Sequence, residues 1–151
     1  MSFQEKNKTV TLVNFSLILA IFLIRVFQMI RTDTFTSTNV FRLWGVIIVL
    51  AVILTIAATI LTHIVSAIIE AIKTGEENPK IEDFEDERDK LIDLRGTKVT
   101  YTVASLGTFL AMLTFVFGQE PLVMFTLLIF FGVLAQIVGD ISRLVLYRRG
   151  F

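Results

Sequence analysis

Four long runs of apolar residues organise the chain, at residues 10–30, 43–69, 99–117 and 121–146. Each run is long enough to cross a hydrocarbon core about 30 Å thick, which takes roughly 20 helical residues. Helices of a soluble domain of this length would each show a polar face, whereas these runs are apolar nearly all the way round. The pattern predicts four membrane-spanning helices.

The runs favour helices over the strands of a membrane β-barrel. Residues 44–54 do not alternate between polar and apolar positions, as strands of a barrel would. We therefore expect residues 1–151 to form a single all-α transmembrane domain, a four-helix bundle. Small residues four apart predict close helix contacts. These pairs are Gly107 with Ala111 and Ala135 with Gly139.

Composition agrees with a membrane protein and excludes some chemistry. The chain is 54% hydrophobic and holds 14 Phe, against a usual apolar share of about 45–50%. It holds no cysteine, which excludes disulfides, thiolate metal sites and cysteine nucleophiles. The first run is too long for the apolar part of a secretory signal, so we expect it to be a retained span.

The Lys and Arg residues predict the orientation, because cytoplasmic loops are enriched in both. Of the 14 in the chain, eleven lie in the N-terminal tail, in residues 73–98 (the acidic loop) or at the C-terminal end. Only Arg31 and Arg42 fall on the opposite side, and Arg25 lies inside the first run. We expect a multi-pass protein of the cytoplasmic (inner) membrane with both termini and the acidic loop inside.

The acidic loop contains a segment with helical periodicity. Residues 81–95 place Phe84, Leu91 and Ile92 on one face, which predicts a short amphipathic helix resting against the mouth of the bundle. Gly96 offers a stop and a hinge before the third run. On this interpretation the loop helix is separate from the third span.

The dense carboxylates of the acidic loop do not have the spacing of an EF-hand. Counting from Asp83, position 6 is Arg88 where glycine is needed, and position 12 is Leu94 where glutamate is needed. A solvated helix face, a surface for protein docking and an irregular cation site remain as alternatives. We expect no cofactor.

Two short motifs carry a resemblance. Asp86-Glu87-Arg88 is followed by Ile92, and the chain ends in Tyr147-Arg148-Arg149-Gly150-Phe151. From about residue 82 onward the chain resembles small bacterial and archaeal multi-pass membrane proteins of unknown function, which share the first motif and many of which end in the Tyr-Arg-Arg-Gly tail. The resemblance implies a topology and no activity. Within the loop it singles out Asp86, Glu87 and Arg88 beside the apolar residues as candidates for interaction.

Two stripes of polar residues interrupt the apolar runs. The second run carries Thr55, Thr59, His63, Ser66 and Glu70, and the fourth carries Gln136, Asp140 and Arg143. Members of a stripe are three or four positions apart and so share a helix face. Because both runs end on the cytoplasmic side, we expect the two stripes to meet there, with Tyr101 at a similar depth. Ionisable groups at membrane depth are candidates for function, and a structural network is the alternative.

Three arginines are candidates for contact with lipid. Arg25 either lines a cavity together with Gln28 or extends along the apolar surface toward the outer headgroups. Arg148 and Arg149 stand where anionic headgroups would attract them.

Two hypotheses of function follow. The first is a non-enzymatic interaction or regulatory module that works through the acidic loop and the basic tail. The alternative is a small oligomeric transporter or channel that uses His63, Glu70 and Asp140. One histidine and no cysteine leave little for catalysis, so we expect no enzyme. The expected partners are the lipid bilayer, a second copy of the chain and a cytoplasmic or membrane protein, with no nucleic acid.

Overall fold

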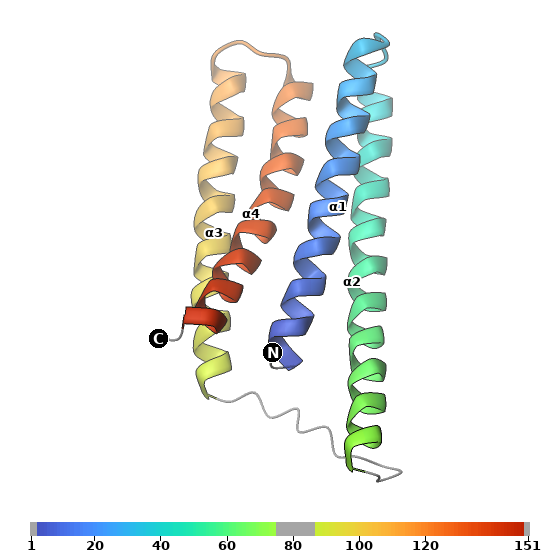
Figure 1. Ribbon diagram of the computed structural model, residues 1–151. Helices are drawn as coiled ribbons and strands as arrows, with labels where there is room; N and C mark the ends of the chain where they lie inside the picture. Colours follow the sequence, from blue (N-terminus) through green and yellow to red (C-terminus); the bar gives the residue numbers. More distant parts are fainter. Residues whose placement is uncertain (1–2, 75–86, 150–151) are drawn as a thin grey trace.

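Four α-helices make up the described part of the chain, which a computed structural model shows in Figure 1. Residues 3–74 and 87–149 are described, without the side chains of Phe3, Thr62, Ser66, Ile69, Glu70, Lys73 and Thr74. The helices are α1 (Phe3–Arg31), α2 (Ser37–Thr74), α3 (Glu87–Val116) and α4 (Pro121–Arg149). No strand occurs among these residues, which confirms the all-α prediction.

Turn residues set the ends of the helices. The hydroxyl of Thr36 accepts a hydrogen bond from the backbone N–H of Asn39 at 3.4 Å and so caps α2. After α3, Gly118 adopts a φ of 82°, a conformation that glycine reaches without steric cost. Pro121 then opens α4, where its missing N–H would have had no partner in the helix.

The helices lie side by side in the order α2, α1, α4, α3 (Figure 1). The main contacts join α3 to α4, α4 to α1, and α1 to α2, so that α2 and α3 stand at the two edges. The expected four-helix bundle is therefore an open row. The start of α1 and the end of α4 lie at the same end of the molecule.

An apolar core of described residues lies where α1, α2 and α4 meet. It contains Ile18 and Phe22 of α1, Leu43 and Ile47 of α2, and Val133 and Ile137 of α4. The contact between α3 and α4 depends instead on small residues. Gly107, Ala111, Ala135 and Gly139 are all buried, and a Cβ on Gly107 would collide with Phe131. The close contact predicted from these small residues is confirmed.

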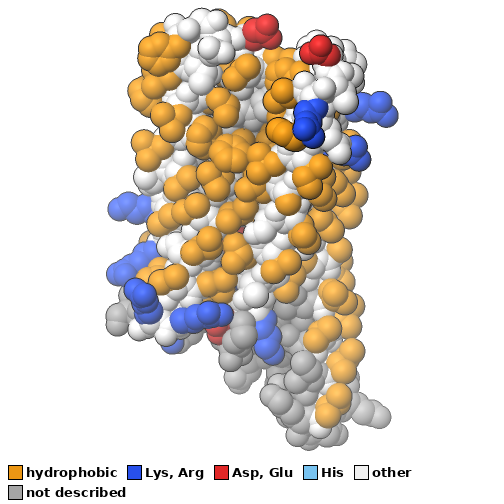
Figure 2. Space-filling model, turned by 45° about the horizontal axis from the view of Figure 1, so that its top comes forward, with side chains coloured by type: hydrophobic (Ala, Val, Ile, Leu, Met, Phe, Trp, Pro, Cys, Tyr) orange, Lys and Arg blue, Asp and Glu red, His pale blue; other side chains and the backbone are white. Residues whose placement is uncertain are grey.

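The outside of the row is apolar. In Figure 2 hydrophobic side chains cover the middle of the molecule, and Lys and Arg gather mainly in its lower part. All four helices are long and apolar enough to cross a membrane, and at most 22% of the residues in the most apolar window of each are buried inside the protein. Because the remaining apolar surface needs lipid around it, the chain is a multi-pass membrane protein.

The third helix begins earlier than the sequence indicates. It runs from Glu87 without a break through Gly96, so the expected stop and the separate helix of the acidic loop are wrong for the described residues. Gly96 is buried inside the helix, where a Cβ would meet the side chain of Arg143. Gly96 allows the side chain of Arg143 to lie close against the backbone of α3. Phe84 and Asp86 lie outside the described residues.

Only one of the two described apolar residues expected to pack on the bundle does so. Ile92 is completely buried, whereas Leu91 is 50% exposed. The two positions are 100° apart around the helix, so one can face α4 while its neighbour faces outward.

Candidate functional site

The polar residues of α4 form the centre of a buried cluster. Gln136, Asp140 and Arg143 follow one another at steps of four and three and therefore lie on one face of the helix. The side chain of Asp140 is 1% exposed and that of Arg143 is 8% exposed. Charges this deep require partners, because burial of an isolated ion is very costly.

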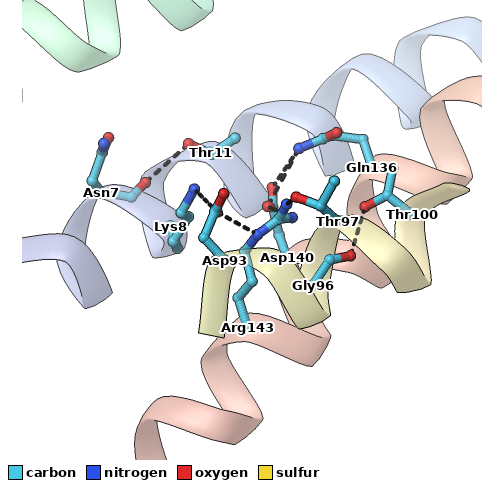
Figure 3. A network of polar contacts seen from close by, with 10 residues as sticks. All are labelled: Asn7, Lys8, Thr11, Asp93, Gly96, Thr97, Thr100, Gln136, Asp140 and Arg143. Atoms are coloured by element: carbon cyan, nitrogen blue, oxygen red, sulfur yellow. Dashed lines mark hydrogen bonds and ion pairs between the residues drawn. The ribbon is translucent and has the colours of Figure 1, made fainter. Parts of the chain in front are cut away.

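Arg143 uses all three of its guanidinium nitrogens (Figure 3). Its Nη1 donates to Oδ1 of Asp140 at 3.1 Å, and its Nε donates to Oδ1 of Asp93 at 2.9 Å. Its Nη2 donates to the hydroxyl of Thr97 at 2.8 Å. Two of these partners belong to α3, so Arg143 joins the two helices through charge-assisted hydrogen bonds.

Asp93 extends the cluster to a third helix. Its Oδ1 also accepts a hydrogen bond from Nζ of Lys8 in α1 at 3.0 Å. The side chain of Asp93 is 48% exposed, so this edge of the cluster lies close to solvent or headgroups. We refer to Lys8, Asp93, Asp140 and Arg143 as the charge network. Its two cations and two carboxylates balance.

Gln136 completes the environment of Asp140. Its Nε2 lies 3.3 Å from Oδ1 and 3.4 Å from Oδ2 of that carboxylate. Among the described residues, every buried polar side-chain atom has a hydrogen-bond partner. A fully satisfied network of this kind holds its helices in one arrangement.

Two glycines make room for the charge network. A Cβ on Gly96 would collide with the aliphatic part of Arg143, and a Cβ on Gly139 would collide with the hydroxyl of Thr100. Thr100 donates that hydroxyl to the carbonyl of Gly96 at 3.1 Å. Any larger residue at either glycine would separate α3 from α4 at the level of the network.

The structure brings together three of the residues expected in the polar cluster and separates others. Gln136, Asp140 and Arg143 meet, but Tyr101 is 70% exposed and does not take part, so its expected place in the cluster is wrong. The described hydrogen bonds of the three α4 residues are to one another and to α3, and none comes from α2. His63 is half-buried on α2, and the side chain of Glu70 lies outside the described residues.

Sequence reasoning missed Lys8, Asp93 and Thr97. Lys8 falls in the polar tail before the first apolar run, and Asp93 falls among nine acids of the acidic loop, so neither stands out. One signal was available, because Asp93 and Thr97 are four apart and share a helix face if the helix continues through Gly96. The assumed helix end at Gly96 concealed it.

The candidate interaction residues form one surface with the basic tail. Nη2 of Arg88 at the start of α3 lies 3.3 Å from the carbonyl oxygen of Tyr147 near the end of α4. Nε of Arg148 lies 3.6 Å from Oε1 of Glu5 in α1. We refer to Glu87, Arg88, Leu91, Tyr147, Arg148 and Arg149 as the terminal face. All of them except Tyr147 are exposed.

Arg25 lies on the outer surface of α1. Its side chain is exposed, and Nη1 is 3.4 Å from Oε1 of Gln28 one turn further on. This position agrees with an arginine that extends along the helix toward headgroups rather than one that lines a cavity.

Two cavities of the described part contain no member of the charge network in their lining, although Thr97, which contacts Arg143, lines one of them. One of about 400 Å³ between α2 and α4 has an apolar lining that includes Val40, Trp44, Phe125 and Gly132. Another hollow lies on the outer face of α3. Within residues 3–74 and 87–149 no group of three His, Asp or Glu side chains is placed to hold a metal ion.

Comparisons with models of protein families, with curated proteins and with solved structures found no match to this chain. The charge network and the terminal face are therefore the observations on which a function can be argued.

Proposed function

We propose that this protein is a non-enzymatic interaction or regulatory module of the cytoplasmic (inner) membrane. In this proposal both termini lie in the cytoplasm, and the terminal face is the docking surface for a cytoplasmic or membrane protein. The basic residues concentrated at the end where α1 starts and α4 ends support this orientation.

The observation that carries the proposal is the contact between Arg88 and Tyr147. It joins the start of α3 to the end of α4 across 59 positions of sequence and makes one surface of two segments. Beneath this surface the charge network fixes α1, α3 and α4 relative to one another. A surface held rigid before binding loses less conformational entropy when a partner docks.

The two segments of the terminal face also carry the resemblance to small multi-pass membrane proteins of unknown function. We include membership of that group in the proposal. Glu87 and Arg88 of the first motif lie at the start of the surface, and Tyr147, Arg148 and Arg149 of the second lie at its end. A shared docking surface is a physical reason for two distant motifs to occur together in one chain.

A photo-crosslinking amino acid at Leu91 tests the proposal in native membranes. Leu91 lies on the terminal face, whereas Leu110 is equally exposed on the same helix but far from that face, and serves as the matched control. We expect a discrete protein adduct from position 91 and none from position 110. Arg149→Glu should abolish the adduct at unchanged protein level, and Arg25→Gln should leave it.

Two outcomes would contradict the proposal. If positions 91 and 110 give the same adducts, the terminal face has no specific partner. If the adduct has twice the mass of the chain, the surface binds a second copy, and the protein is a homodimer through this face.

The transporter alternative requires Asp140 to change its protonation or its partner, together with His63 and Glu70. The carboxylate of Asp140 is paired with Arg143 and hydrogen-bonded by Gln136, and the described cavities do not reach it. These contacts favour a structural role for Asp140 and therefore the first proposal.

A further inference from the structure

One face of α3 carries exposed polar side chains that no other described helix covers. Lys98, Tyr101 and Ser105 follow at steps of three and four, so they lie on the same face, and all three are exposed. With Thr102 and Leu106 they line an outer hollow of about 860 Å³. Because α3 is an edge of the row, no described helix covers this face.

Arg95, Thr97 and Thr102 also line the hollow and have partners, whereas three other polar side chains of this face have none among the described residues. Within the described residues, the Lys98 ammonium, the Tyr101 hydroxyl and the Ser105 hydroxyl have no hydrogen-bond or ionic partner. Neighbouring hydroxyls behave differently, since Thr102 donates to the carbonyl of Lys98 at 2.8 Å and Thr100 to that of Gly96. Polar side chains that face hydrocarbon find no partner there, so a polar lipid group at this level would satisfy them.

Along α3 this face changes from a cationic side chain to hydroxyl groups and then to apolar side chains. Helix α3 begins at the end where the chain termini lie (Figure 1), so Lys98 is the nearest of the three to that end. Tyr101 follows about one turn further along the helix, and Ser105 lies about 10 Å beyond Lys98. Leu106 and the apolar remainder of α3 follow. An anionic phospholipid presents its groups in the same order from headgroup to tail, with a phosphate, then glycerol esters, then acyl chains.

We propose that this face of α3 binds one anionic phospholipid. The Lys98 ammonium and the Tyr101 hydroxyl donate to the phosphate, the Ser105 hydroxyl donates to a glycerol ester carbonyl, and an acyl chain follows Leu106. Lysine and tyrosine are both frequent at the headgroup level of membrane proteins, and anionic lipids attract lysine there. This proposal is independent of the protein partner proposed for the terminal face.

The test measures how lipids raise the melting temperature of the full chain purified in detergent. Phosphatidylglycerol is compared with phosphatidylcholine at equal concentration, so that charge is the main difference between the additives. We expect the larger increase with phosphatidylglycerol. Lys98→Gln should remove at least half of the difference between the two lipids. Lys90→Gln is the matched control, because it removes an exposed lysine of the same helix outside the hollow and should keep the difference.

Further variants and additives identify the occupant. Tyr101→Phe and Ser105→Ala should each reduce the increase with phosphatidylglycerol, and glycerol phosphate at the same concentration should give none. Equal losses from Lys98→Gln and Lys90→Gln would overturn the site, because the preference would then come from general charge. A full effect of glycerol phosphate would assign the site to a soluble phosphate. Efficient disulfide formation between two Ser105→Cys chains in membranes would assign the face to a second copy.

Discussion

At the scale of residues, Asp140 has Arg143 as its cationic partner, whereas Arg143 pairs with two carboxylates. The carboxylate of Asp140 is 1% exposed and has Arg143 as its cation and Gln136 as its neutral donor. Arg143 also binds Asp93, whose side chain is 48% exposed and can be reached from the surface. Loss of the arginine therefore leaves a buried charge without a counter-ion, whereas loss of Asp140 leaves Arg143 still paired.

We predict that Arg143→Gln is more damaging than the double variant Arg143→Gln with Asp140→Asn. Breaking a buried ion pair by removing one partner costs about 3–5 kcal/mol, and removing both charges avoids most of that cost. Asp140→Asn alone should be milder than Arg143→Gln. The measurements are the yield of monodisperse protein in detergent and its melting temperature. Strictly additive effects would show that the two groups act independently.

At the scale of elements, α3 carries different functions on different faces. Its buried face includes Ile92, Gly96, Gly107 and Ala111 and packs on α4. Asp93 and Thr97 bring hydrogen-bonding groups to Arg143 from an adjacent face. Because α3 continues without a break through Gly96, Asp93 and Thr97 both face Arg143. A hinge at Gly96 would let the part of α3 before it rotate relative to the rest of the helix.

The exposed and the buried apolar residue at the start of α3 should respond differently to truncation. Ile92→Ala removes a fully buried side chain and should cost about 2–5 kcal/mol, because the packed surroundings cannot collapse completely. Leu91→Ala removes a half-exposed side chain and should cost much less. Thermal unfolding of the two variants in the same detergent compares them directly. Equal melting temperatures would mean that the start of α3 does not pack against α4.

At the scale of the whole molecule, the open row gives the protein two ends of different character. One end holds the start of α1 and the end of α4 together with the charge network and the terminal face. The other end holds the two turns, with Arg31 and Arg42 nearby. An even number of spans requires both termini to lie on one side, and the basic residues favour the cytoplasmic side.

Single cysteines test this orientation, since the chain contains none of its own. Thr36 in the turn after α1 and Lys90 at the start of α3 are both exposed, so reagent access differs only through the membrane. An impermeant maleimide should label Thr36→Cys in intact cells, and should label Lys90→Cys only after the membrane is broken. The reverse pattern would invert the proposed topology.

The sequence by itself determined the features that depend on local periodicity. Apolar runs of helical length predict four membrane helices, because lipid forces backbone groups to pair within each segment. Gly107, Ala111, Ala135 and Gly139 predict the close contact between α3 and α4 through size alone. The polar residues of α4 were found because three- and four-residue spacing on a helix needs no knowledge of its neighbours.

Only the tertiary structure decided which residues complete the charge network. Lys8 and Asp93 are 85 positions apart, and Asp93 and Arg143 are 50 apart, so no local pattern pairs them. The order of the helices, which places α1 rather than α2 beside α4 at the level of Asp140, depends on how all the apolar faces pack at once. The role of Gly96 changed for the same reason. From the sequence alone a glycine at this position predicts the end of a helix. In the structure Gly96 lies inside α3 and leaves space for the side chain of Arg143 from α4.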